Sequence, residues 1–102
     1  MFYHSTRSEN NQVSSAEAIK MGLAPDGGLF VPESFPKLSL KEIDSLKGSS
    51  YTQRAVNILS RFLTDFSDEE ILECVNAAYN KQKFETDSIT PVYKLNSQVY
   101  FL

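Results

Sequence analysis

Two stretches in the second half of the chain place apolar residues three and four positions apart, which is the pattern of helices with one buried face. The apolar positions of the first stretch are Tyr51, Ala55, Ile58, Leu59 and Phe62. Those of the second stretch are Ile71, Leu72, Val75, Ala78 and Tyr79. The pattern predicts helices over about 51–64 and 68–82, and the short connection between them favours an antiparallel pair. Cys74 lies beside the second stripe, so we expect a small buried hydrophobic side chain there and not a reactive thiol.

Serine residues mark the starts of four helices, because each is followed three positions later by Glu or Gln. These capping-box pairs are Ser14/Glu17, Ser39/Glu42, Ser50/Gln53 and Ser67/Glu70. In each pair the hydroxyl accepts from an amide of the first turn, and the Glu or Gln side chain reaches back to the Ser amide. Gly22 and Gly48 follow two of the predicted helices, 16–21 and 40–47, and we expect each glycine to end its helix in a left-handed conformation.

Short strands are predicted near both ends of the chain and in its first third. Residues 2–5 and 29–31 form short strand-like runs, and 91–95 with 98–102 flank an Asn96-Ser97 turn as in a hairpin. Residues 99–102 are apolar without alternation, which is typical of a strand buried on both faces. We interpret them as a chain entering a larger body, with a lone edge hairpin as the alternative. Together the elements predict an α+β fold, a small domain of about four helices with a short mixed or antiparallel sheet.

Composition and charge exclude several classes of function. The 102 residues include ten Lys or Arg and thirteen Asp or Glu, a net charge of −3, so no excess of positive charge can follow a nucleic acid backbone. The single cysteine has no partner for an intramolecular disulfide, and no Cys or His pair has the spacing of zinc ligands. No apolar run approaches the roughly 18 residues of a membrane span, and the start of the chain lacks the pattern of an export signal. We therefore expect a cytoplasmic protein with neither nucleic acid nor membrane as partner.

Two short segments are candidates for chemistry. Asp26-Gly27-Gly28 predicts an obligate turn, which either only reverses the chain through positive φ angles or lets backbone amides approach an anion. Ser5-Thr6-Arg7 ends the first predicted strand, either as a solvated strand end or as two hydroxyls and a guanidinium that hold a phosphate or carboxylate. Spacing alone leaves both alternatives open. The sole histidine, His4, has no nucleophile or ligand partner near it in sequence and receives no role.

Several sequence blocks carry a resemblance to a known family. They are YHSTR at 3–7 and GLAPDGGLFVP at 22–32, followed in order by FPKL at 35–38 and PVYKL at 91–95. These blocks closely resemble the amino-terminal domain of threonine synthases, and the resemblance covers essentially all of 1–102. It implies that 1–102 is one domain of a longer, fold-type II pyridoxal phosphate enzyme. The implied reaction converts O-phospho-L-homoserine and water to L-threonine and phosphate.

The resemblance also implies where the chemistry lies. The family's cofactor lysine belongs to a Phe-Lys-Asp-type motif beyond residue 102, so we expect no catalytic, cofactor-binding or metal-binding residue here, and an inactive chain when it stands alone. We expect the chain to pack on the pyridoxal phosphate domains. The residues it implies near the substrate are Ser5, Thr6, Arg7, Asp26, Gly27 and Gly28. The family continues with a glycine after Arg7, whereas this chain has the polar run 8–12, so that loop is expected to follow a different path.

Two other functions stay open at this point. One is a threonine-synthase-like phospho-lyase, which eliminates phosphate from a related phosphoamino acid without making threonine. The other belongs to a different class, a free-standing helical interaction module whose apolar hairpin docks on a partner. An unpaired hairpin edge also predicts self-association of the chain when it stands alone.

Overall fold

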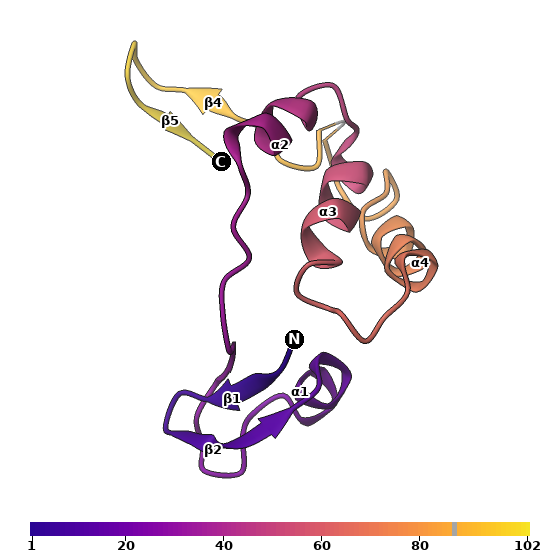
Figure 1. Cartoon of the computed structure of the whole chain (residues 1–102). Helices are drawn as coiled ribbons and strands as arrows, with labels where there is room; N and C mark the ends of the chain where they lie inside the picture. The colour runs from indigo at the N-terminus through magenta and orange to yellow at the C-terminus, as the bar shows by residue number, and fades with distance from the viewer. Residues whose placement is uncertain (87) are drawn as a thin grey trace.

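The computed structural model describes residues 1–86 and 88–102, and for Asn11 only the backbone. Along the chain, a small sheet with one helix comes first, and a helical region follows it (Figure 1). The elements of the first part are β1 (Tyr3–Ser5), β2 (Ser8–Val13), α1 (Ser15–Met21) and β3 (Phe30–Pro32). The later elements are α2 (Leu40–Ser45), α3 (Tyr51–Leu59), α4 (Asp68–Ala78), β4 (Tyr93–Lys94) and β5 (Tyr100–Phe101). The predicted α+β fold, with four helices and short antiparallel sheets, is confirmed.

β1 lies at the centre of the first sheet, between β2 and β3, and runs antiparallel to both. The strands predicted at 2–5 and 29–31 are confirmed to within one residue at each end. The loop expected at 8–12 is wrong, because this segment belongs to β2 and pairs with β1. Its polar residues show no apolar alternation, but a strand at the edge of a sheet does not need a buried row on both sides.

The helix starts agree with the sequence in detail, because all four capping boxes are present. The four Ser hydroxyls accept from the amides of the third helical residue at 3.2–3.3 Å. The Glu or Gln side chains accept from the Ser amides at 2.7–3.0 Å. Each helix therefore begins where its own local sequence satisfies the first amides. Across the described residues, every helix is too short or too polar to span a bilayer.

The helix ends differ from the prediction more than the starts do. Gly22 ends α1 with the expected positive φ, +72°, but its ψ of −66° lies outside the left-handed helical region. The prediction for Gly48 is wrong, because α2 ends at Ser45 with Leu46 as a right-handed cap, and Gly48 has no positive φ. α3 ends at Leu59 instead of 64, because the chain tightens into bonds three residues apart, from Arg61 to Ile58 and from Phe62 to Leu59. α4 likewise stops at Ala78 instead of 82.

α3 and α4 form the predicted antiparallel pair, since the start of each lies at the end of the other. The Tyr51 and Tyr79 rings meet edge to face with centroids 5.0 Å apart. At the opposite end, Ser60 Oγ donates to Asp68 Oδ1 at 2.6 Å. Ile71 and Val75 are 3% and 2% exposed and are the most buried apolar side chains of the described chain. They form the centre of its small core.

The prediction of a buried thiol at Cys74 is wrong. The side chain is exposed, because its neighbour Val75 occupies the inward position on that turn of α4. Ile58 and Leu72 of the predicted stripes are also exposed, at 40% and 43%. The apolar stripe is therefore wider than the surface that the two helices bury against each other.

β4 and β5 form the predicted hairpin, with Tyr93 opposite Phe101 and Lys94 opposite Tyr100. The Asn96 side-chain oxygen accepts from the amides of Gln98 and Val99 at 2.9 Å and fixes the turn. Residues 99–102 are all exposed, so the expected burial of this strand on both faces is not seen in the described chain. The hairpin extends away from the helices, in yellow in Figure 1.

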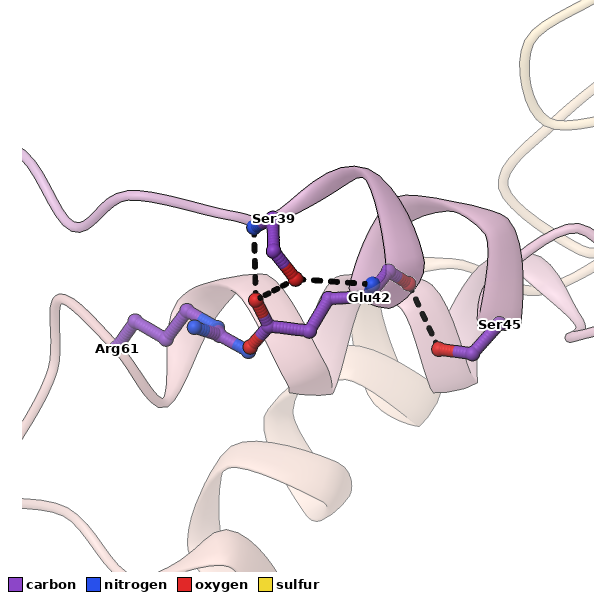
Figure 2. Close-up of polar contacts among 4 residues, drawn as sticks. All are labelled: Ser39, Glu42, Ser45 and Arg61. Carbon is purple, nitrogen blue, oxygen red and sulfur yellow. Dashed lines mark hydrogen bonds and ion pairs between the residues drawn. The ribbon is translucent and has the colours of Figure 1, made fainter.

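Glu42 joins α2 to Arg61, which follows the end of α3 (Figure 2). Its Oε2 accepts from the amide and the hydroxyl of Ser39, both at 2.7 Å, and its Oε1 accepts from Arg61 Nη2 at 3.0 Å. The hydroxyl of Ser45 donates to the Glu42 carbonyl at 2.7 Å. One carboxylate therefore completes a capping box and pairs with a cation in the turn that follows α3. The Ser39 hydrogen bonds, followed by the Arg61 guanidinium, lower the pKa of Glu42 to about 2.

We expect Glu42→Gln to remove part of the acid sensitivity of folding. Since the folded pKa of Glu42 is about 2 against 4.5 for the ordinary carboxyl, its contribution to stability is present above about pH 4.5 and is lost as the pH falls through 2. Urea unfolding between pH 7 and pH 2 measures this directly. The variant should show a shallower loss of unfolding free energy in that window than the unaltered chain, and a parallel pH profile would contradict the assignment.

Candidate functional site

The structure brings the two predicted segments together at one corner of the sheet. β1 pairs with β3 so that Ser5 lies opposite Phe30, and a bridge between Leu23 and Leu29 closes the turn that precedes β3. Within that turn the Gly27 amide donates to the Ala24 carbonyl at 2.8 Å. The six residues expected near the substrate are therefore neighbours, and we call them the Ser5–Asp26 cluster. Its members are Ser5, Thr6, Arg7, Asp26, Gly27 and Gly28.

Ser5 is the buried centre of the cluster, at 4% exposure. Its hydroxyl donates to Asp26 Oδ1 at 2.7 Å and accepts from the Arg7 amide at 3.1 Å. The Gly28 amide donates to the same carboxylate oxygen at 2.9 Å. The alternative of a solvated strand end is therefore wrong for Ser5, because its hydroxyl is buried and joins β1 to the turn. Thr6 and Arg7 are exposed, as that alternative expects.

Gly27 and Gly28 each favour glycine for a different physical reason. Gly27 has φ +77°, a conformation that residues with a Cβ rarely adopt. Gly28 does not have a positive φ, so the expected pair of left-handed glycines holds for Gly27 alone. At Gly28 the constraint is space, because a Cβ there would lie 2.1 Å from Ser5 Oγ and 3.0 Å from Asp26 Oδ1. The close approach of β1 to the turn therefore requires glycine at this position.

Thr6 and Arg7 complete the connection between the strand and the turn. The Thr6 amide donates to the Leu29 carbonyl at 2.9 Å, and the Leu29 amide donates to Thr6 Oγ1 at 3.1 Å. Arg7 Nη1 donates to the Asp26 carbonyl at 3.1 Å. A guanidinium carries five N–H donors, so one bond to the backbone orients Arg7 and leaves other donors for an anion.

The two charged groups of the cluster, Asp26 and Arg7, have different roles. The Ser5 hydroxyl, then the Gly28 amide and the Arg7 charge, hold the pKa of Asp26 below its ordinary value. Asp26 is therefore ionised at neutral pH, and its charge disfavours an anion placed directly on it. Arg7 is the group in the cluster that can attract a phosphate or carboxylate.

A pocket of 360 Å³ adjoins the cluster at Ser5 and Asp26. Asn10 and Gln12 also line it, and their positions two apart put them on one face of β2. The sequence gives no signal for these two residues, because the polar run 8–12 predicts a loop. His4, which received no role, lies in β1 with Nδ1 3.1 Å from the Ser5 carbonyl oxygen. Within the described ranges no three potential metal ligands lie close together.

A family model described as the threonine synthase N terminus matches residues 2–79. The chain belongs to the threonine synthase family. Threonine synthase of Methylobacillus glycogenes is 34% identical over 109 residues, which cover all of this chain and 23% of that protein. Threonine synthase-like 1 of Homo sapiens is 40% identical over 90 residues, covering 85% of this chain and 12% of that protein.

Solved threonine synthase structures show the same fold. The pyridoxal phosphate-bound enzyme from Brucella melitensis aligns with a TM-score of 0.86 and 30% identity, over 98% of this chain and 21% of that one. The Escherichia coli enzyme aligns with a TM-score of 0.81 and 34% identity, over 98% of this chain and 22% of that one. The chain thus corresponds to the amino-terminal region of threonine synthases and spans less than a quarter of the length of these relatives.

Proposed function

We propose that residues 1–102 are the amino-terminal domain of a threonine synthase, which converts O-phospho-L-homoserine and water to L-threonine and phosphate. The observation that carries this proposal is the family match over 2–79. The coverage of 98% of this chain but about a fifth of two solved threonine synthases supports it. On this proposal the reaction takes place in the remainder of a longer enzyme, which we place in the cytoplasm.

The residues of this chain do not fit the family's cofactor. Pyridoxal phosphate is held in such enzymes through an imine to a lysine, which loses its proton readily only in desolvated surroundings. All seven lysines of the chain are exposed. We therefore assign pyridoxal phosphate binding and catalysis to the rest of the enzyme and none of it to this domain.

We place the Ser5–Asp26 cluster beside the substrate, with Arg7 as its phosphate-attracting group. The support is local geometry: Arg7 is exposed, its Nη1 is held at 3.1 Å by the turn, and the ionised Asp26 stabilises that turn. Ser5, Thr6, Gly27 and Gly28 then act by positioning Arg7. A guanidinium held by one donor can offer two parallel N–H groups to a phosphate.

The test of this role is Arg7→Ala in the full-length enzyme that carries this sequence. We expect the KM for O-phospho-L-homoserine to rise about tenfold, the usual effect of losing one charge-assisted hydrogen bond. Arg54→Ala is the matched control, since it removes an exposed guanidinium from α3 at a distance from the cluster. Steady-state kinetics that do not change in Arg7→Ala would remove Arg7 from the site.

We further propose that the exposed apolar hairpin packs on the pyridoxal phosphate domains. Tyr93, Tyr100 and Phe101 are more than half exposed and Leu102 is 81% exposed. Apolar surface of this kind is normally covered by a partner.

A threonine-synthase-like phospho-lyase, the alternative that the sequence resemblance leaves open, is the second candidate function, and a protein named threonine synthase-like 1 is among the relatives at 40% identity. Incubation of the full-length polypeptide with pyridoxal phosphate and O-phospho-L-homoserine separates the two. Phosphate and threonine in equal amounts support threonine synthase, and phosphate without threonine supports the lyase. If a polypeptide that ends near Leu102 yields neither product, the interaction module is the remaining candidate function.

A further inference from the structure

The candidate cluster lies in a part of the molecule that is separate from the helical pair. We call β1, β2, α1 and β3 the sheet unit, and α3 with α4 the helical pair. An extended segment joins the sheet unit to α2, and the connection between α3 and α4 reaches down toward the first strand and α1 (Figure 1). The position of the sheet unit therefore depends on contacts with that connection.

Four hydrogen bonds converge on residues 62–65 of the connection. The Tyr3 hydroxyl donates to the Phe62 carbonyl at 3.0 Å, and the amine of Met1 donates to Thr64 Oγ1. The Ser15 hydroxyl donates to Asp65 Oδ1, and the Ala16 amide donates to Asp65 Oδ2 at 2.9 Å. Three of the bonds come from the sheet unit and one from Met1 just before it, and each reaches a segment about fifty residues or more away in sequence.

Asp65 acts as a second cap for α1. Ser14 satisfies the Glu17 amide at 3.2 Å, and Asp65 satisfies the Ala16 amide that the capping box leaves open. Ser15, which lies between Ser14 and Ala16 in sequence, is 1% exposed and is the most buried side chain of the described chain. The hydrogen bond from Ala16 is the main reason that the pKa of Asp65 lies below its ordinary value.

Both halves of the Ser5–Asp26 cluster are carried by elements that residues 62–65 hold. Tyr3 and Ser5 lie two residues apart in β1. α1 leads through Gly22 into the turn that contains Asp26. We propose that residues 62–65 form a clamp that fixes the sheet unit against the helical pair, and that Asp65 is the positioning residue for the cluster through its two bonds to α1. The kinetic consequence of the clamp rests on the proposed function.

The first test is amide hydrogen exchange in the full-length enzyme carrying Asp65→Asn. The substitution keeps the side-chain volume but replaces one carboxylate oxygen with an NH₂ group, which cannot accept from the Ser15 hydroxyl or the Ala16 amide. We therefore expect amide exchange in α1 to become about fivefold faster, as for the loss of a helix cap. Exchange in α4 should not change. Asp44→Asn is the matched control, because it makes the same chemical change in an exposed pair with Lys47. Unchanged exchange in α1 would overturn the clamp whatever the enzyme's activity.

The second test is a double-mutant cycle with Arg7→Ala. If Asp65 acts through the cluster, Asp65→Asn raises KM about threefold with kcat unchanged, because fewer molecules hold Arg7 in its binding position. In the Arg7→Ala background the same change should have no further effect on KM. Additive effects, or a lower kcat with constant KM, would overturn the positioning role. If Arg7→Ala alone has no effect, the substrate role and the positioning of that site both fail, while the exchange experiment still decides the clamp.

Discussion

Gly28→Ala is expected to destabilise the chain by about 3 kcal/mol, at the upper end of the cost of overpacking. The added Cβ would overlap Ser5 Oγ, so either the Ser5 hydroxyl must rotate away from Asp26 or β1 and the turn must move apart. Ser5 is 4% exposed, and its bond to Asp26 would lengthen or break in that movement. The loss of a satisfied buried hydroxyl adds to the steric cost. Urea unfolding followed by circular dichroism measures the change.

Gly48→Ala is the control for this prediction. A Cβ at Gly48 meets nothing within 4 Å, and its φ is not positive. The substitution should leave stability unchanged or raise it by about 0.5 kcal/mol, because alanine restricts the unfolded chain. Equal unfolding midpoints for the two variants would show that the close approach at Gly28 is not required.

Ile71→Ala is expected to cost about 3 kcal/mol of unfolding free energy. Ile71 is 3% exposed at the centre of the α3–α4 pair, and large-to-small substitutions at such sites lose both transfer free energy and packing around the new cavity. In a chain with so few buried apolar side chains, this loss should unfold a large share of molecules at 37 °C. Thermal unfolding and urea titration both report it.

Leu72→Ala is the matched control on the next position of the same helix. Leu72 is 43% exposed, so its truncation should cost about 1 kcal/mol or less. A loss at Leu72 equal to that at Ile71 would mean that the buried face of α4 is assigned to the wrong residues. Comparing the two variants removes the effect of alanine on helix propensity, which acts in the same direction in both.

The sequence predicts the starts of the helices well and their ends poorly, for a physical reason. A capping box is complete within four residues, so Ser50 and Gln53 contain the information that begins α3. The apolar spacing that predicts residues 60–64 as helix continues through tight turns, where Phe62 and Leu63 are half-buried. The apolar spacing therefore continues past Leu59, although the helix ends there.

Features that depend on distant residues could not be predicted from local patterns. β2 is polar and forms because β1 pairs with it, so no periodicity signals it. The cluster was found as two separate motifs, but the bond between Ser5 and Asp26 spans 21 residues and was not foreseen. Asp65 was missed for the same reason, since it caps a helix that lies 49 residues earlier.

The distance in sequence between the sheet unit and Asp65 affects how the chain folds while the ribosome makes it. β3 ends at Pro32, so the sheet can form early, but its clamp residue Asp65 follows 33 positions later (65 minus 32). At about 5–20 residues per second, the sheet unit waits roughly 2–7 s before the clamp can close. During that interval the polar side chains of β2 disfavour pairing of neighbouring chains with that edge of the nascent sheet.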